Sequence, residues 1–356
     1  MKLEIPIVKK EVLFTPKCNM NCSYCYEPNK RFIELKIEDA KMLADDLCSL
    51  EFYLMGGEPF LNIDFISTLI DEIAKKDIDQ MQKRRLIDSL RFVVTNGTLI
   101  KNNIDIVKKY GLRLSISLDG PEAINDKNRI YHNGKGTFRD IMDGIDTCIA
   151  NNIEWSIHST ISINNLKNFF SLFMFYLNLA TNIYSIDDAI EYMSSNMFQI
   201  ITTENIFDSD INAFIEQQEK IMKYIITSSL DKSKKNRLAK GWFKKIKSSS
   251  CNAGNQLVAV DGIGDIYPCG ELAATSEGTK YSNFKILDNY IAIKESRVFS
   301  SNFETLQENQ KYYTLWCPSA NLVSSGSVFY QNCKYNLMID EYNRFIDEMF
   351  SYYGIK

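Results

Sequence analysis

Hydrophobic and polar residues follow two alternating patterns from residue 11 to about residue 195. Short runs rich in β-branched and aromatic residues predict strands at residues 11–16, 52–55, 91–95, 113–118, 155–163 and 189–193. Amphipathic stretches between them predict helices at residues 37–50, 64–76, 104–110, 137–151 and 166–180. This alternation favours an α/β fold with a parallel sheet, and six units favour an open or partial (β/α)6 barrel. In such folds the chemistry lies at the carboxyl ends of the strands.

The pattern changes in the last third of the chain. A helix is expected at residues 211–228, and residues 232–247 carry eight Lys or Arg in sixteen positions. That basic segment is either a docking strip for an acidic peptide or a solvated helix, and the second interpretation is favoured. Gly, Asn, Ser and Cys become frequent from Cys251 onward. We therefore expect a barrel at 1–230, a connecting segment at 231–250, and a small α+β domain with a C-terminal helix at 251–356.

Composition narrows the class of protein. The chain is 45% hydrophobic, which suits a globular core, and its net charge of −4 disfavours a nucleic-acid partner. The longest apolar stretch, residues 169–180, is too short to span a bilayer, and no secretory signal precedes residue 14. Nine cysteines without an export signal indicate the reducing cytoplasm, where thiols bind metals or stay free.

Three cysteines follow the first strand with the spacing Cys-x3-Cys-x2-Cys, at Cys18, Cys22 and Cys25. Three thiolates on one loop can hold three irons of a cubane cluster and leave the fourth open to a small molecule. Zinc is the alternative, but zinc takes four ligands, and the two histidines, His132 and His158, are distant in sequence. The cysteines alone favour iron–sulfur chemistry and leave zinc open.

Glycine and polar turns end the next three strands. They are residues 56–59 (Gly-Gly-Glu-Pro), 96–97 (Asn-Gly) and 119–121 (Asp-Gly-Pro). The glycine pair offers bare backbone that a ligand can approach closely. Because the carboxyl ends of parallel strands share one rim, we expect all three turns to lie beside the cysteine loop.

With these motifs the sequence resembles the radical S-adenosylmethionine (SAM) superfamily. The resemblance rests on the cysteine triplet with Tyr24 before its last member, and on the turns at 56–59, 95–97 and 117–121. It covers about residues 11–165. Residues 125–138 are similar to the branch that modifies peptides and proteins, although that branch often has His where this chain has Asn125.

The resemblance implies a TIM-type partial barrel and a [4Fe–4S] cluster on Cys18, Cys22 and Cys25. It implies that the open iron binds SAM, which is cleaved reductively to methionine and a 5′-deoxyadenosyl radical. The turn at Glu58 would hold the amino group of SAM, Ser117 would lie near its ribose, and Arg129 would face its carboxylate. The implied SAM-binding residues are Tyr24, Gly56, Gly57, Glu58, Pro59, Thr95, Asn96, Ser117, Asp119 and Arg129. No catalytic side chain is assigned.

Four late cysteines look like the auxiliary-cluster region of the SPASM and Twitch families. They are Cys251, Cys269, Cys317 and Cys333. A full SPASM region carries seven cysteines, so four are similar to a Twitch-type enzyme with one auxiliary [4Fe–4S] cluster. A four-cysteine zinc clip is the alternative. Cys48 and Cys148 are expected to be small core residues at helix ends.

Other chemistry-bearing residues receive weaker assignments. We expect His158 to be a core residue. Trp155, Tyr24 and Tyr26 could line the pocket, but core packing is the default for aromatic side chains. Asp261 and Glu271 could act as bases. Sulfatase-type maturases carry Asp directly after the cysteine that corresponds to Cys269. Gly270 stands there in this chain, which weakens a sulfatase interpretation.

The resulting hypothesis is a radical SAM enzyme that modifies a ribosomally synthesised precursor peptide by oxidative cross-linking, through a thioether or carbon–carbon bond. Alternatives are a radical epimerase, a sulfatase-maturase-like modification of a folded protein, an enzyme acting on a small molecule, and a non-enzymatic iron–sulfur electron carrier. A flavodoxin- or ferredoxin-type donor is implied. Seventeen residues precede Cys18, too few for a recognition domain, so leader binding is expected on the existing surface or on a separate protein. We expect no nucleic acid or membrane partner.

Overall fold

The computed structural model describes residues 9–25, 33–45, 51–195, 197–200, 206–245, 257–260, 265–267, 269–270, 284–287, 290–292 and 333–355. The chain divides into two compact units. The first combines residues 1–116, 129–155 and 251–309, and the second combines 117–128, 156–250 and 310–356. Within the described ranges, no helix is long and apolar enough to cross a membrane.

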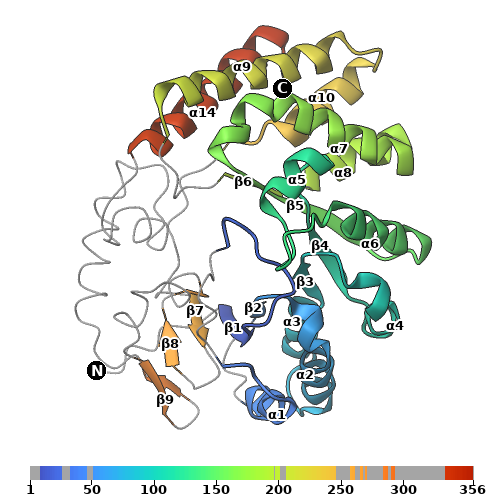
Figure 1. Cartoon of the computed structure of the whole chain (residues 1–356), viewed down its shortest axis with the longest axis vertical. Coiled ribbons are helices and arrows are strands. Elements are labelled where there is room, and N and C mark those ends of the chain that lie inside the picture. The colour runs from blue at the N-terminus through green and yellow to red at the C-terminus, as the bar shows by residue number, and fades with distance from the viewer. Residues whose placement is uncertain are drawn as a thin grey trace. The chain divides into compact units, whose positions relative to one another are not determined.

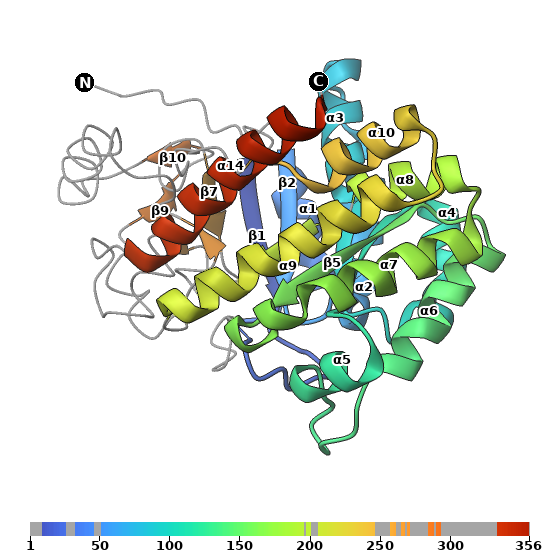
Figure 2. The same cartoon turned by 90° about the horizontal axis from the view of Figure 1, so that it is seen from above.

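The first unit contains strand β1, which lies inside a six-stranded sheet with the order β10-β9-β8-β7-β1-β2 (Figure 1; β10 is labelled in Figure 2). The strands are β1 (Lys9–Thr15), β2 (Glu51–Gly56), β7 (Leu257–Val260), β8 (Asp265–Tyr267), β9 (Phe284–Leu287) and β10 (Tyr290–Ala292). β1 pairs in parallel with both β2 and β7, whereas β8, β9 and β10 continue the sheet in antiparallel fashion. The late part of the sequence therefore extends the sheet that carries the cysteine loop.

Two further strands and the covering helices complete the described part of this unit. β3 (Phe92–Thr95) and β4 (Arg113–Ser117) pair in parallel. The helices are α1 (Ile37–Asp45), η1 (Pro59–Asn62), α2 (Ile63–Lys75), α3 (Gln80–Leu90), α4 (Ile100–Tyr110) and α6 (Phe138–Ala150). α2 buries one face of Ile, Leu and Phe side chains, as its periodicity predicts.

The second unit is mostly helical. β5 (Trp155–Ile161), which begins at the boundary between the units, pairs in parallel with β6 (Met197–Ile200). The helices are α5 (Glu122–Asn128), η2 (Ile163–Asn168), α7 (Phe169–Ile183), α8 (Ile186–Ser195), α9 (Asp208–Thr227), α10 (Lys232–Trp242) and α14 (Cys333–Tyr353). α14 runs beside α9 in both views (Figures 1 and 2). Aromatic rings join these helices, with Phe173 and Trp242 at 4.7 Å and Phe214 and Tyr342 at 5.5 Å.

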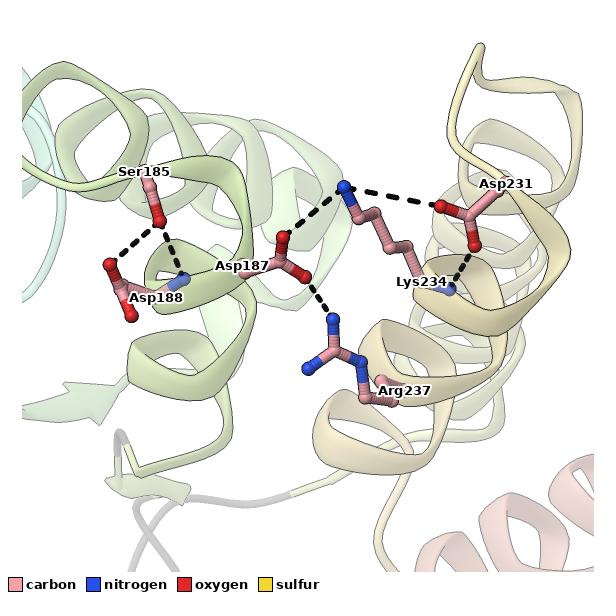
Figure 3. Close-up of polar contacts among 6 residues, drawn as sticks. All are labelled: Ser185, Asp187, Asp188, Asp231, Lys234 and Arg237. Atoms are coloured by element: carbon pink, nitrogen blue, oxygen red, sulfur yellow. Dashed lines mark hydrogen bonds and ion pairs between the residues drawn. The ribbon is translucent and has the colours of Figure 1, made fainter.

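The predicted strand at 189–193 is wrong, because these residues form the middle of α8. Ala189, Ile190 and Met193 are buried, which is the spacing of one helix face. Ser185 caps the helix: its hydroxyl accepts from the Asp188 N–H (3.2 Å) and contacts the Asp188 carboxylate (Figure 3). The sixth strand follows four residues later, as β6. The other five predicted strands are confirmed as β1 to β5.

The basic segment begins as a helix that packs in the second unit. α10 buries Leu238, Ala239 and Trp242. On its other side Lys234 lies 3.2 Å from the Asp187 carboxylate of α8, and Arg237 pairs with the same carboxylate (Figure 3). These two cations lower the pKa of Asp187. Part of the basic composition therefore attaches α10 to α8, and use of the remaining lysines for docking stays a hypothesis.

Candidate functional site

The loop after β1 carries the three early cysteines. Cys18, Cys22 and Cys25 are all partly buried. The Cys25 N–H donates to the Cys22 carbonyl (3.2 Å), and the Met20 N–H lies 3.4 Å from Cys18 Sγ. Met20 is buried and pairs with Tyr131 as an isolated bridge. The loop therefore has defined internal bonds and one apolar anchor.

The glycine pair after β2 accommodates the chain's own backbone. The Gly57 N–H donates to the Thr15 carbonyl (2.7 Å), and the Glu58 N–H donates to the Lys17 carbonyl (2.8 Å). A Cβ atom on Gly57 would lie 2.2 Å from the Lys17 oxygen, closer than real contacts allow. These glycines thus let the β2 turn press against the segment that leads into Cys18.

Glu58 joins the ends of two strands. Its carboxylate is fully buried and accepts from the Phe60 N–H (3.1 Å), the Thr95 hydroxyl (2.7 Å) and the Asn96 N–H (2.7 Å). Burial raises the pKa of this carboxyl, while the three donors and nearby Arg129 act in the opposite direction. The Glu58 side chain therefore connects the β2 and β3 turns through hydrogen bonds. Its contact with SAM stays a prediction.

Two asparagines connect the β3 turn to the cysteine loop. Asn96 Nδ2 donates to Asn19 Oδ1 (2.8 Å), and Asn19 Nδ2 donates to the Thr98 hydroxyl (2.9 Å). Asn96 Oδ1 also accepts from the Thr98 backbone N–H (3.0 Å). The predicted meeting of the Asn-Gly turn with the loop is confirmed. Asn19 and Thr98 were not predicted, because a lone polar residue between cysteines carries no spacing signal.

A hairpin at residues 129–137 holds the other side of the loop. Arg129 Nη1 donates to the Tyr24 hydroxyl (2.9 Å), and the Asn21 N–H donates to the Ile130 carbonyl (2.7 Å). His132 Nε2 donates to the Cys18 carbonyl (3.0 Å). Tyr24 and Arg129, both expected at the site, are thus in contact. His132 was considered only as a distant zinc ligand, and its contact depends on a fold that brings residue 132 back to residue 18.

The hairpin has its own internal bonds. The Thr137 hydroxyl donates to the Arg129 carbonyl (2.8 Å), and the Tyr131 N–H donates to the Lys135 carbonyl (2.9 Å). The Tyr131 hydroxyl donates to Asp140 at the start of α6 (2.5 Å). The hairpin is therefore a braced element, so it can fix the loop that it contacts.

The third turn, at residues 117–121, lies in the second unit. Asp119 is fully buried; its Oδ1 accepts from the Thr160 N–H (3.0 Å), and its own N–H donates to Asn125 Oδ1 (3.2 Å). The Tyr176 hydroxyl donates to the Leu118 carbonyl (2.8 Å). These bonds tie the turn to β5 and α7, while Ser117 is half-buried. The roles of Ser117 and Asp119 toward SAM stay predictions.

Two of the four late cysteines lie among the described residues. Cys269 is described and half-buried, and Cys333 is the first residue of α14. Cys251 and Cys317 lie outside the described residues, as do Cys48, Tyr26, Asp261 and Glu271. Cys148 is buried in α6 and its burial raises the pKa of the thiol to about 12, which confirms it as a core residue. Trp155 is likewise a core residue.

The early cysteines fit a cluster by the chemistry of their donors. Three thiols on one loop, with no competing histidine ligand in the turn, present the donor set of a three-cysteine cubane. Among the described residues, no three His, Cys, Asp or Glu side chains converge as a single metal ion requires. A cubane makes a different demand, because each thiolate binds a different iron. Cys18, Cys22 and Cys25 are the residues that would hold it.

The early part of the chain, residues 12–169, is similar to one known superfamily. Residues 12–169 match the family model of the Radical SAM superfamily. Uncharacterized protein MJ0907 of Methanocaldococcus jannaschii is 29% identical over 270 residues, which are 74% of this chain and 84% of that protein. A cysteine-type anaerobic sulfatase-maturating enzyme of Clostridium novyi is 29% identical over 175 residues, which are 45% of each chain. The match to that enzyme thus spans less than half of its length.

Solved structures share the fold over nearly the whole chain. The structure of hexahistidine-tagged anSMEcpe with bound AdoMet has a TM-score of 0.63 at 18% identity and covers 96% of this chain and 98% of its own. Native anSMEcpe with bound AdoMet and the Cp18Cys peptide has a TM-score of 0.61, also at 18% identity, and covers 98% of this chain and 100% of its own. At this identity the likeness establishes the fold.

Proposed function

The chain contains a radical SAM domain, whose cofactors are a [4Fe–4S] cluster and SAM, and from this premise we propose that it is a maturase that modifies a peptide substrate. The observation that supports this most strongly is the cysteine loop itself. It is held on one side by Asn96 and Thr98 and on the other by the hairpin that carries Arg129 and His132. A loop held in this way can present three thiolates before any cluster binds.

Residues around the loop have separate tasks in this proposal. Cys18, Cys22 and Cys25 hold the cluster, and the Gly56–Gly57 turn packs directly against the backbone that leads into Cys18. Arg129 offers a cation for the carboxylate of SAM, and Tyr24 orients that guanidinium. When bound, the cluster and SAM supply a 5′-deoxyadenosyl radical, and the surrounding protein excludes water and positions the substrate.

We assign the fold as a TIM-type partial barrel followed by a small auxiliary domain. Four late cysteines, Cys251, Cys269, Cys317 and Cys333, are proposed to hold one auxiliary [4Fe–4S] cluster that accepts an electron from the substrate. A substrate that gives a hydrogen atom to the 5′-deoxyadenosyl radical, an electron to this cluster and a proton from the attacking side chain to solvent forms a new bond, which favours oxidative cross-linking of a ribosomal precursor peptide. Thiolate ligands need a reducing compartment, so we place the reaction in the cytoplasm with a flavodoxin- or ferredoxin-type donor.

The substrate class is supported by the related proteins. The Clostridium novyi enzyme matures sulfatases, and the anSMEcpe structure was solved with a peptide. Modification of a folded protein is therefore the second candidate. Gly270 beside Cys269 weakens the case for a sulfatase-type maturase. Epimerisation, with a thiol returning the hydrogen atom, is a further alternative, beside action on a small molecule and a non-enzymatic electron carrier.

The first test is anaerobic turnover of SAM by the reconstituted chain with a strong reductant. We expect 5′-deoxyadenosine from the native chain and from Cys148→Ala, which removes a buried thiol elsewhere, and none from Cys25→Ala.

A candidate precursor peptide encoded beside the gene is then co-expressed in deuterated water. Loss of a hydrogen pair supports cross-linking, whereas gain of one deuterium without that loss indicates epimerisation. Absence of 5′-deoxyadenosine would contradict the proposed function.

A further inference from the structure

Glu11 on β1 contacts a residue 259 positions later in the chain. Its Oε2 accepts from the Gly270 backbone N–H at 2.7 Å. Gly270 directly follows Cys269, one of the four cysteines proposed for the auxiliary site. The contact therefore links β1, the strand that leads into the cysteine loop, to the backbone beside a proposed ligand.

The same glycine packs against β2. A Cβ atom on Gly270 would lie 2.7 Å from Met55 Sδ and 3.2 Å from Glu11 Oε2. Leu13 and Met55 are paired in the β1–β2 register, so Glu11, Leu13 and Met55 share one face of the sheet. Cys269 and Gly270 thus lie over that face, with the backbone of Gly270 close to two side chains.

The segment before Cys269 is anchored to the same face. Glu11 is paired with Ala259 of β7, and Ala259 is paired with Tyr267 of β8. Ala259 and Tyr267 are buried with Leu13 in a small core to which Met55 adds. Cys269 therefore lies between two attachments, the Tyr267 core on one side and the Glu11 hydrogen bond on the other.

We infer that Glu11 is a positioning residue that fixes Cys269 on the face of β1. This inference rests on the proposed function for the role of Cys269 as a cluster ligand, but its geometry does not depend on that role. β1 leads into the Cys18 loop at its carboxyl end and holds the Cys269 segment through Glu11. One strand thereby sets the position of members of both cysteine groups.

The contact requires a hydrogen-bond acceptor at residue 11. Glutamine offers a carbonyl oxygen at the same reach, so Glu11→Gln can keep the bond, whereas Glu11→Ala removes it. Leaving the buried Gly270 N–H without an acceptor costs about 1–3 kcal/mol, which corresponds to about tenfold in the population of an opened segment, and Glu11→Gln avoids this cost. Glu38→Ala, which removes an exposed carboxylate from α1, is the matched control.

The test is the rate at which N-ethylmaleimide labels Cys269 in the iron-free full-length chain, read by peptide mass spectrometry. We expect Glu11→Ala to raise this rate about tenfold, the change that the lost bond predicts. Glu11→Gln and Glu38→Ala should match the native chain, and labelling of Cys22 should be unchanged in every variant, which also reports that the fold is intact. An unchanged Cys269 rate in Glu11→Ala, or a Glu11→Gln rate as high as that of Glu11→Ala, would overturn the inference.

A second measurement covers the case in which Glu11→Ala does not fold. In a chain with Cys18, Cys22 and Cys25 replaced by Ala, any bound iron belongs to the late cysteines, and Glu11→Gln should retain this iron during chelator challenge as the native residue does. Faster loss in Glu11→Gln contradicts the positioning role. If that background binds no iron with Glu11 intact, the auxiliary cluster is wrong, and the Cys269 labelling rate of Glu11→Gln decides the inference: a rate equal to that of the native chain supports it and a faster rate contradicts it.

Discussion

Glu58 is a buried carboxylate whose three donors come from two different turns. In Glu58→Gln one carboxylate oxygen becomes an NH2 group, so either the Asn96 N–H or the Phe60 N–H would face another donor. A buried donor left without an acceptor costs about 1–3 kcal/mol. We expect Glu58→Gln to lower the free energy of unfolding by that amount at neutral pH, measured by urea unfolding of the iron-free chain. Glu154→Gln, at an exposed position, should stay within about 0.5 kcal/mol.

The pH dependence of the same variant follows from the raised pKa. The folded chain holds the Glu58 proton more tightly than the unfolded chain, in which the pKa is near its ordinary value of 4.5. The stability from this group is therefore present below that value and is lost as the pH rises through the raised pKa. The native chain should gain stability over Glu58→Gln as the pH is lowered from neutral to the ordinary carboxyl pKa of 4.5. A difference that stays constant over this range would show that burial does not raise this pKa.

The site residues that could be predicted from the sequence are those whose side-chain type suits few structural roles. The cysteine triplet, the glycine pair and the Asn-Gly turn were identified, because few structures need those residues at those spacings. Asn19, Thr98 and His132 were not identified as contacts of the loop. Each uses a common polar side chain whose partner is distant in sequence, so the contact exists only once β3, the hairpin and the loop are in place.

At the scale of elements, the hairpin at 129–137 is the brace that the fold adds to the cysteine loop. Tyr131 anchors it to α6 through Asp140, and His132 reaches the Cys18 carbonyl. We expect Tyr131→Phe combined with His132→Ala to reduce the iron retained by the reconstituted chain severalfold, because the loop loses a preset conformation. Iron per chain after gel filtration measures this. Lys135→Ala, at the exposed tip, should retain iron like the native chain, and equal retention by the double variant would contradict a bracing role.

The elements that sequence did not predict have physical reasons. α3 is polar overall and buries Leu86 and Leu90 among its few apolar residues, so its helical periodicity is weak, although Asp79 caps it through the Met81 and Gln82 N–H groups. α5 is only seven residues long. Residues 189–193 were assigned to a strand because their apolar run is short, and the cap at Ser185 was the signal that could have corrected this.

At the scale of the whole molecule, the order of the sheet joins the early and late parts of the sequence. β7 pairs with β1 in parallel, so residues beyond 250 extend the sheet that leads into the cysteine loop. No sequence pattern gave this pairing, because β7 to β10 are short and far from β1 in sequence. The consequence is that Cys269 belongs to a segment attached to β1, so the metal content of the late cysteines has to be measured on the full chain.

That metal content distinguishes the cluster from the zinc alternative. With clusters in both cysteine groups, the anaerobically reconstituted chain should hold about eight irons and no zinc, and Cys18→Ala with Cys22→Ala and Cys25→Ala should reduce this to about four. A zinc clip on the late cysteines predicts about four irons and one zinc in the native chain, and zinc alone in the triple variant. Elemental analysis of both proteins separates these outcomes. Because zinc cannot change its oxidation state, the zinc result would also remove the electron acceptor on which oxidative cross-linking depends and would favour epimerisation.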